Sequence, residues 1–427
     1  MKGILVGFAA VLMVQMPARG AVLHVPEEYL TVLKAVDVAV AGDSVLVGPG
    51  IWNATEARTV LVFGTLQTVQ SAMYLKPGVT VIGVAGAATT VLDGGQPTLY
   101  PVCTIEDGLP GAVAAHVVGL TVTGGGSGVA VSESPLELVD CQITGNHDYG
   151  VLASKAAVTL TRCVVSNNQL SGAGDGGVDG HDIDLTCTGC TFAQNILGLR
   201  VETVEHLPMT VVLRDCVFRD HSLRGAVVTD VASVDIERCT FLRNCVAGGT
   251  NGLGGGLWLF RCSGNLRFCT FAYDSAGSGG GAAASLSYVH VESNTFFGCH
   301  AGILAAALCV DGTDVGTNHN IFASSTGRRG AVSGLIRNPQ TGCNLFWNNV
   351  DGDYYEHWLP PPTDIHADPL FCDPVALDFH LQDASPAAPA HSGGCGLIGA
   401  FDVNCGPVSA GGSLESRSWG SLKSLYR

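Results

Sequence analysis

The stretch "VDIERCTFLRN", Val234–Asn244, contains an outline that returns along the chain. Val234 and Ile236 are apolar and two positions apart, Cys239 follows three positions later, and Phe241 and Asn244 complete the outline. A self-similar pattern at a spacing of 22 to 30 residues predicts a repeat architecture. The positions equivalent to Cys239 are Cys141, Cys163, Cys190, Cys216, Cys269, Asn294, Asn320 and Asn344.

Two columns of residues accompany these anchors. The residues two positions beyond them form an apolar, mostly aromatic column: Ile143, Val165, Phe192, Phe218, Phe241, Phe271, Phe296, Phe322 and Phe346. The residues five positions beyond them favour left-handed backbone and main-chain hydrogen bonds, so we expect a turn at each. They are Asn146, Asn168, Asn195, His221, Asn244, Asp274, Cys299, Ser325 and Asn349.

The residues before each anchor alternate between apolar and polar, which is typical of a strand with one buried face. Identical strands stacked about 4.8 Å apart would bury these faces in one continuous core, as in a solenoid. The same register places opposite charges side by side at the corners. The expected pairs are Asp140 with Arg162, Asp215 with Arg238, and Glu237 with both Arg214 and Arg267.

These residues resemble the right-handed parallel β-helix proteins of the pectate-lyase-like superfamily. The resemblance implies an all-β fold, a right-handed single-stranded parallel β-helix with a short N-terminal capping helix. In "VPEEYLTVLKAVDVAVAGDSVLVGPGIW", Val25–Trp52, the helix would run over 27–40 and Gly42-Asp43 would turn into the first strand. The Gly-rich stretches 251–260 and 275–284 resemble motifs of bacterial polymorphic outer-membrane proteins, or serve tight corners.

The expected organisation is a signal peptide over 1–20, a β-helix over 21–405 and a flexible tail over 406–427. Within the β-helix, 21–60 forms the N-terminal cap region, and 366–405 is similar to the closing segment of secreted bacterial β-helix proteins and would cover the last coil. In that segment, five residues are interpreted as turn formers: Asp368, Pro369, Asp373, Pro374 and Asp378. The leader has one Lys, an apolar run and small residues before the cleavage site, and no later segment could span a membrane.

Composition limits the partners. Hydrophobic residues make up 47% of the 427 positions and charged residues only 14%, so the chain can bury a large core. The net charge of −16 disfavours nucleic acids and anionic membranes and favours neutral partners or calcium. We expect an exported monomer, secreted or on the cell surface.

The chain has 16 cysteines, and export favours some disulfides. The cysteines of the anchor column are interpreted as stacked core residues, although bonds between adjacent rungs remain an alternative. The best single candidate for a disulfide is Cys395 with Cys405, which both lie in the closing segment.

One stretch, "DGGVDGHDID" over 175–184, gathers acidic side chains. Asp182 and Asp184 would share a face at the start of a strand, at a separation that suits glycoside hydrolysis by two carboxylates. His181 could relay a proton, and Lys155 of the preceding rung would lie beside Asp182. The candidate catalytic residues are therefore Asp179, His181, Asp182, Asp184 and Lys155, and the candidate calcium ligands are Asp175, Asp179 and Asp182.

A solvated structural loop is the alternative interpretation of this stretch. The signatures of pectate lyases and polygalacturonases are absent, so the resemblance implies the fold and not an active site. The first functional hypothesis is a non-catalytic secreted or cell-surface protein that binds neutral glycans or acts as a scaffold. The second is a carbohydrate-active enzyme, either a polysaccharide lyase or a glycoside hydrolase, and the third is a rigid spacer.

Overall fold

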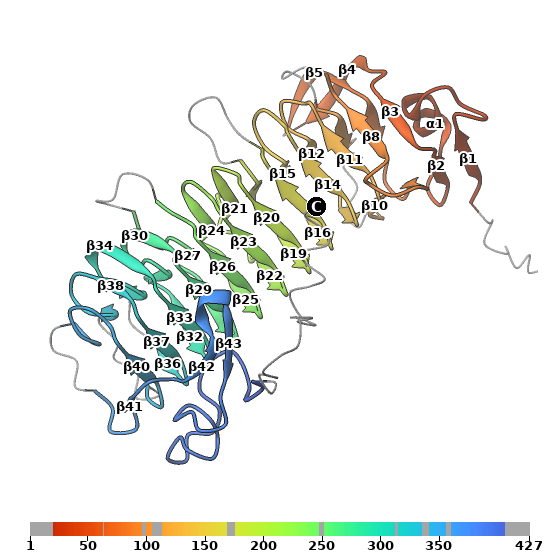
Figure 1. Ribbon diagram of the computed structural model, residues 1–427. Helices are drawn as coiled ribbons and strands as arrows, with labels where there is room; N and C mark the ends of the chain where they lie inside the picture. The colour runs from red at the N-terminus through yellow and green to blue at the C-terminus, as the bar shows by residue number, and fades with distance from the viewer. Residues whose placement is uncertain are drawn as a thin grey trace, which may run out of the picture.

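Three long parallel sheets wind around one axis to form a solenoid (Figure 1). The computed structural model describes residues 20–62, 64–95, 100–104, 113–168, 176–246, 252–311, 315–334, 341–355 and 360–405. Residues 1–19 of the predicted leader, the predicted tail and Asp175 lie outside the described residues. Each turn contributes one strand to each sheet, so every strand pairs with its counterparts in the neighbouring rungs.

The first sheet has 12 strands, the second 13 and the third 11. The first contains β1 (Val22–Val25), β2 (Ser44–Val47), β7 (Thr80–Gly83), β10 (Ala115–Val118), β13 (Leu136–Val139), β16 (Ala157–Thr161), β19 (Asp184–Thr188), β22 (Thr210–Arg214), β25 (Ser233–Glu237), β28 (Ser263–Arg267), β32 (Tyr288–Glu292) and β36 (Gly316–Asn318). The second contains β3 (Gly50–Trp52), β8 (Thr90–Asp93), β11 (Thr121–Thr123), β14 (Gln142–Thr144), β17 (Val164–Ser166), β20 (Thr191–Ala193), β23 (Val217–Arg219), β26 (Thr240–Leu242), β29 (Thr270–Ala272), β33 (Thr295–Phe297), β37 (Ile321–Ala323), β40 (Leu345–Trp347) and β41 (Ile365–His366). The third contains β6 (Met73–Leu75), β9 (Val102–Thr104), β12 (Val129–Ser132), β15 (Val151–Ser154), β18 (Val178–His181), β21 (Leu197–Glu202), β24 (Arg224–Thr229), β27 (Leu257–Phe260), β31 (Ala282–Ser285), β35 (Leu308–Asp311) and β39 (Val332–Gly334).

The remaining elements lie outside these sheets. They are the helix α1 (Val32–Val38), the antiparallel hairpins β4 (Glu56–Val62) with β5 (Thr65–Ser71) and β42 (Phe371–Asp373) with β43 (Asp378–Leu381), the short parallel strands β30 (Ser275–Ser278), β34 (His300–Leu304) and β38 (Thr326–Gly327), and the 3-10 turn η1 (Pro374–Ala376).

The quoted stretch is one part of a rung, as predicted. β25 leads to a corner at Arg238, β26 follows, and a second corner lies at Arg243. Both corner residues have a left-handed backbone, with φ of 51° and 54°. The expectation of left-handed backbone at Asn244 itself was wrong, because the turn is made one residue earlier and the asparagine side chain points into the core.

The sequence analysis did not identify the third strand of each rung. Its signal is a glycine before a short apolar-polar alternation, as in Gly225 before β24. A Cβ on Gly225 would lie 2.5 Å from the carbonyl oxygen of Gly256 in the next rung and 2.9 Å from the ring of Phe241. Close approach between rungs therefore requires glycine here, which also explains the Gly-rich stretches.

Like side chains stack along the inside of the solenoid. The predicted aromatic column is confirmed, because the rings of Phe192 through Phe346 stack with centroids 4.7–5.1 Å apart and are almost fully buried. The anchor cysteines are buried and free, which confirms stacking over bonding. Burial raises the pKa of the Cys239 thiol well above its usual value, so this thiol is unreactive.

The predicted corner ion pairs are also present. Asp140 lies 2.7 Å from Arg162, and Asp215 lies 2.8 Å from Arg238. Glu237 lies 3.8 Å from both Arg214 and Arg267. These pairs are largely exposed and worth at most about 1 kcal/mol each, so they confirm the register and add little stability.

The asparagine column forms a buried hydrogen-bonded ladder. The Oδ1 atom of Asn168 accepts from the backbone N–H and the Nδ2 amide of Asn146, while its own Nδ2 donates to the carbonyl of Ile143. Asn195 repeats these bonds one rung later. Each side chain therefore satisfies backbone groups of the preceding rung that would otherwise be buried without partners.

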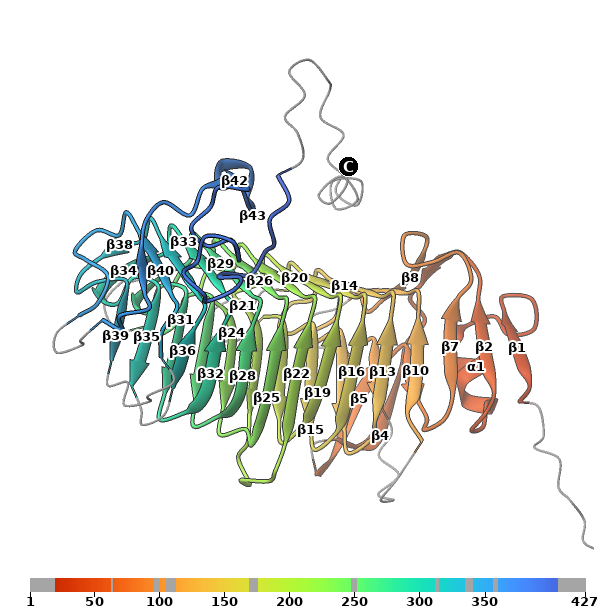
Figure 2. The ribbon, with the colours of Figure 1, turned by 90° about the horizontal axis from the view of Figure 1, so that it is seen from below.

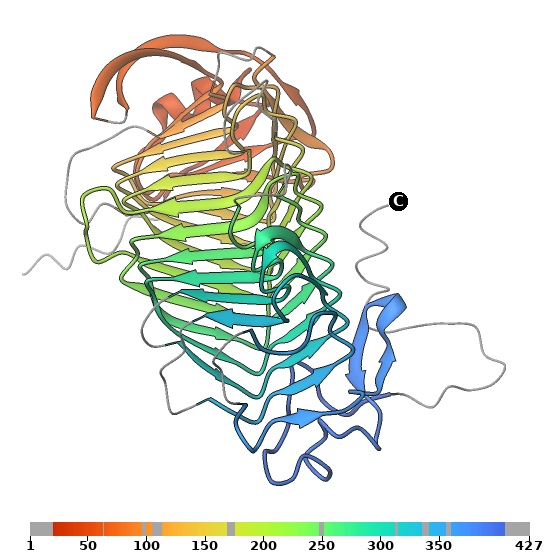
Figure 3. The same ribbon diagram turned by 90° about the vertical axis from the view of Figure 1, so that its left-hand side faces the viewer.

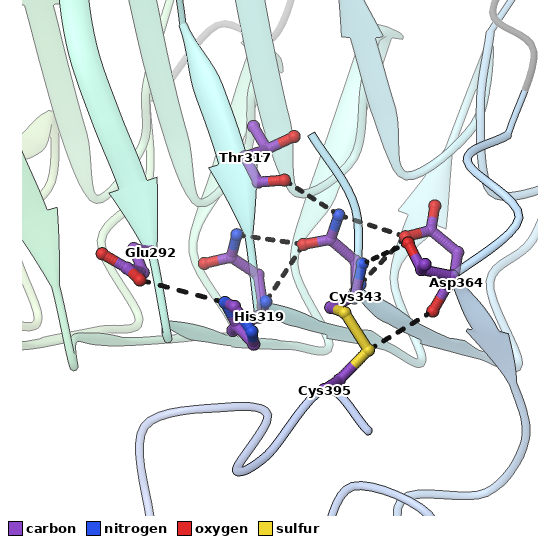
Figure 4. The surroundings of a disulfide bond; sticks show 9 residues. Glu292, Thr317, His319, Cys343, Asp364 and Cys395 are labelled. Carbon is purple, nitrogen blue, oxygen red and sulfur yellow. Dashed lines mark hydrogen bonds and ion pairs between the residues drawn. A yellow bond between two sulfur atoms is a disulfide. The ribbon is translucent and has the colours of Figure 1, made fainter. Parts of the chain in front are cut away.

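Two such ladders end at carboxyl groups. The first passes from Asn244 to Asp274, and the second passes from Asn344 to Asp364 (Figure 4). Asp364 also accepts a hydrogen bond from the hydroxyl of Tyr354. The Oδ2 atom of Asp274 is buried without a partner among the described residues, and burial raises the pKa of this carboxyl well above its usual value.

We predict that Asp274→Asn stabilises the protein at pH 7. An amide can accept from Asn244 and can also donate to the preceding rung, as Asn168 does, which is worth about 1–3 kcal/mol. Because the folded-state pKa of Asp274 is raised, the wild type should lose stability as pH rises from about 4 through that pKa, and the variant should not. Urea denaturation at several pH values measures both effects.

The control variant is Asp364→Asn, where Tyr354 already supplies a donor to the second oxygen. This change should give no gain in stability. An equal gain in both variants would show that the carboxyl of Asp274 is not the source of the effect.

The N-terminal end of the solenoid is covered by α1. The helix begins after Thr31, whose Oγ1 accepts from the backbone N–H of Lys34, and it is shorter than the predicted 27–40 because Ala39 is extended. Its apolar side packs on the core of the first rungs. The predicted Gly42-Asp43 turn is present, and Asp43 accepts from the backbone of Ala21.

The closing segment, residues 366–405, packs against the side of the solenoid, and its expected role as a cover for the last coil stays a prediction. It folds back over the outer face of the second sheet, where Figures 2 and 3 show β42 and β43 beside the solenoid. Phe371 and Phe379 pack on Phe297 of β33, with ring centroids 5.9 and 5.2 Å away. A second apolar core therefore lies outside the solenoid, between this segment and the rungs from β26 to β41.

Two disulfides hold this segment, and neither is the predicted Cys395–Cys405 bond. Cys343 of the last rungs bonds Cys395 (Figure 4). Cys372 bonds Cys405. The prediction was wrong because the segment folds back onto the rungs, so Cys395 faces Cys343. The predicted aspartate turn formers are confirmed, since Asp368, Asp373 and Asp378 each accept a backbone hydrogen bond two or three residues later.

Candidate carbohydrate-binding face

The candidate residues Asp179 and His181 project outward from the third sheet. Both belong to β18, in which Val178 is buried in the solenoid core, and the alternation of a strand places Asp179 and His181 on the opposite side. The register sets Asp179 beside Arg200 and His181 beside Glu202 of β21. We call Asp179, His181, Arg200 and Glu202 the His181 cluster.

The His181 cluster is a closed network of charges. The ring of His181 lies between two carboxylates, with Nε2 3.4 Å from Asp179 and Nδ1 3.0 Å from Glu202. Arg200 lies 2.8 Å from Glu202 and 4.0 Å from the Oδ1 atom of Asp179. Asp179 is only 3% exposed, and its Oδ1 accepts no hydrogen bond from the described residues.

These neighbours change the protonation of His181. The hydrogen bond to Asp179 raises the pKa of His181 above its usual value, and the charge of Glu202 adds to the shift. Partial burial and Arg200 act in the opposite direction. The histidine is thus held in place as a cation more readily than a free imidazole.

We predict that Asp179→Asn lowers the pKa of His181, because the strongest partner of the imidazolium loses its charge. A raised folded-state pKa means that this interaction stabilises the protein below about pH 6.5 and is lost as pH rises through the folded-state value. Titration of the His181 ring protons by NMR measures the shift. Asp184→Asn is the control, and an equal shift in both variants would refute the assignment.

Asp182 and Asp184 lie on either side of a corner and hold the loop between β21 and β22. Asp182 is not at the start of a strand as predicted, because it forms the corner with φ of 53°, and β19 begins at Asp184. Its Oδ1 atom accepts from the backbone N–H groups of Val204 and Glu205, at 2.8 and 3.0 Å. Asp184 accepts from the N–H of Thr210, at the other end of the same loop.

Lys155 occupies the corresponding corner of the preceding rung. Its backbone N–H donates to the carbonyl of His181, which sets it beside Asp182 in the stack, as the register predicted. The Nζ atom, however, pairs with Glu205 at 2.6 Å. That hydrogen bond is the main reason why the pKa of Lys155 is raised, so the amine is less able to act as a base.

Calcium binding remains a prediction. Asp175 lies outside the described residues, Asp182 is bonded to backbone amides, and Asp179 faces His181. Within the described ranges, no three His, Cys, Asp or Glu side chains are arranged to hold a metal ion.

Further along the same outer face lies an aromatic pair that the sequence analysis missed. Trp258 and Phe260 project from β27, with ring centroids 5.9 Å apart. The guanidinium groups of Arg224 and Arg261 lie over these rings, 5.3 and 4.7 Å from the centroids. The alternation in "GLWLF", 256–260, would have revealed the pair had the third strand been recognised.

The register joins the aromatic pair to the His181 cluster. Asp179, Arg200, Val227 and Trp258 form one outward column, and His181, Glu202, Thr229 and Phe260 form the next. The outer face therefore carries charged, hydroxyl and aromatic side chains and one valine over the four consecutive rungs of β18, β21, β24 and β27. We call these eight residues the mixed face.

The family model for right-handed β-helix regions matches residues 108–268. The fold is therefore a right-handed parallel β-helix, as the sequence resemblance implied. No curated protein sequence matches the chain. None of the described helices has the length and apolarity needed to cross a membrane.

Similar solved structures include carbohydrate-active enzymes. The pectate lyase Pel9A is 13% identical, with a TM-score of 0.47, and the match covers 87% of this chain and 90% of that one. The A-module of the Azotobacter vinelandii mannuronan C-5 epimerase AlgE6 is 15% identical, with a TM-score of 0.42, covering 79% of this chain and 94% of that one.

Proposed function

We propose that the protein is an exported, non-catalytic β-helix protein that binds glycans through the mixed face. The observation that carries the proposal is the aromatic pair Trp258 and Phe260 in register with the His181 cluster. Aromatic side chains offer an apolar surface for the C–H faces of sugar rings, and neighbouring polar groups can hydrogen-bond the hydroxyls. The mixed face combines both kinds of group on a rigid sheet.

The partners of the candidate acids support a non-catalytic role. Asp182 and Asp184 accept hydrogen bonds from backbone N–H groups, which hold the carboxylates in place. A general acid must be able to reach the glycosidic oxygen of the substrate. Carboxylates that are hydrogen-bonded to the backbone of the loop between β21 and β22 are poorly suited to act as general acids.

Export is supported by the leader-like stretch over 1–20 and by the disulfides. The bonds Cys343–Cys395 and Cys372–Cys405 require an oxidising compartment in most organisms. The proposed location is therefore outside the cytoplasm, in the medium or on the cell surface.

Trp258→Ala and Phe260→Ala test the proposed site. Each should weaken glycan binding about tenfold, because the stacking surface is lost. Affinity electrophoresis against neutral β-glucan, galactan and mannan measures the change. Tyr288→Ala is the matched control, since this tyrosine is 57% exposed but lies on the first sheet. Equal loss in the control, or no binding by the wild type, would contradict the proposal.

The alternative is a polysaccharide lyase or glycoside hydrolase. It is favoured by one observation, the contact between His181 and Asp179, which resembles a base held by a carboxylate. New reducing ends and unsaturated uronates, followed with calcium and then with chelator, would reveal such an activity. Turnover that disappears in the Asp179→Asn variant would replace the non-catalytic proposal with this one.

A further inference from the structure

We infer that the mixed face selects uncharged glycans and excludes polyuronates. This inference rests on the proposed function and adds to it the chemical class of the ligand. It depends on the partners of the charged groups around His181 and on the unsatisfied atom of Asp179.

The cations around His181 are already paired with carboxylates. Lys155 pairs with Glu205, Arg200 pairs with Glu202, and His181 lies between Asp179 and Glu202. A uronate approaching this surface would have to break one of these pairs to find a counterion. The uronate would then leave a protein carboxylate without its ion pair, so exchanging one ion pair for another adds no net binding free energy.

The local charge is also unfavourable for an anion. Around His181, Asp179, Asp182, Glu202 and Glu205 provide four carboxylates, whereas Lys155 and Arg200 provide two permanent positive charges and the protonated His181 ring a third. The surplus is confined to this part of the face, because Arg224 and Arg261 lie over the aromatic pair. The surplus of negative charge repels a polyuronate over roughly a Debye length, which is about 10 Å at 0.1 M salt. The net charge of −16 on the whole chain acts in the same direction.

Asp179 offers a hydrogen-bond acceptor that suits a neutral glycan. This side chain is 3% exposed and faces outward, and its Oδ1 has no hydrogen-bond donor among the described residues. A sugar hydroxyl can donate to such an oxygen, whereas an ionised uronate carboxylate can only accept. A buried acceptor without a partner costs about 1–3 kcal/mol, so a hydroxyl that reaches it contributes affinity.

Trp258, in the same column, offers a hydrogen-bond donor where Asp179 offers an acceptor. Its indole Nε1 is a donor, and it is also buried without a partner among the described residues. Three rung steps separate it from Asp179, which corresponds to about 14 Å along the solenoid. Because a hydroxyl both donates and accepts, a polyhydroxyl chain lying along the axis can serve both ends of the column.

Matched ligands test the inference. Neutral β-glucan, galactan and mannan are each compared with a sample oxidised at C6, which converts a hydroxymethyl group to a uronate and leaves the backbone unchanged. At low salt, the neutral polymer that binds should lose at least about tenfold in affinity on oxidation. The difference should narrow at 0.5 M salt, because screening weakens the repulsion.

A paired set of variants locates the cause. Glu202→Gln combined with Glu205→Gln removes two negative charges and leaves Arg200 and Lys155 without these ion pairs, so affinity for the oxidised polymers should rise at least about threefold. Glu292→Gln is the control, because it removes a negative charge from β32 of the first sheet. It should leave binding of the oxidised polymers unchanged.

The outcomes separate the inference from the proposed function. Equal binding of neutral and oxidised polymers, or preference for the oxidised ones, would overturn the inference and leave glycan binding standing. A similar gain in the Glu292→Gln variant would also overturn it, because the selectivity would then come from overall charge. If no neutral or oxidised polymer binds, the proposed function fails and the inference fails with it.

Discussion

The structure depends on one constraint, which is that each rung must bond its neighbours through both backbone and side chains in the same register. Backbone hydrogen bonds set the strands side by side, and the buried columns then require like residues at like positions. The asparagine ladder shows the strength of this requirement, because each side chain serves backbone groups of the preceding rung. A shift by one residue would turn every inward side chain outward.

The features of the fold that repeat along the chain could be predicted from the sequence, and those without a periodic pattern could not. The spacing of the anchors and the phenylalanine column were sufficient to predict a parallel solenoid, and the corner charges were sufficient to predict its register. The third strand was not predicted because its signal is a glycine. That glycine is required because the backbone comes close to a carbonyl group of the next rung, and no local conformational preference reveals this contact in the sequence. The disulfides were mispredicted for a similar reason, since Cys395 meets Cys343 only after the closing segment folds back.

In the candidate site too, residues close in sequence were recognised, whereas residues brought together by the register of the third sheet were missed. The sequence placed Asp179 and His181 in one acidic stretch and Lys155 beside Asp182, and the catalytic role expected of them stays a prediction. It missed Arg200 and Glu202, which meet them only through the register of the third sheet. It also placed Asp182 at the start of a strand, because a residue that forms a corner and bonds backbone N–H groups looks the same in sequence as one that begins a strand.

The attachment of the closing segment has a consequence for how the molecule can change in length. Its apolar residues pack on the rungs from β26 to β41, and the Cys343–Cys395 bond joins it to the rung of β40. Loss or gain of a rung between β26 and β41 would displace the apolar residues on which the closing segment packs. Among the described residues, the rungs from β12 to β21 contribute none to that second core, so the N-terminal half of the solenoid can gain or lose whole turns more freely.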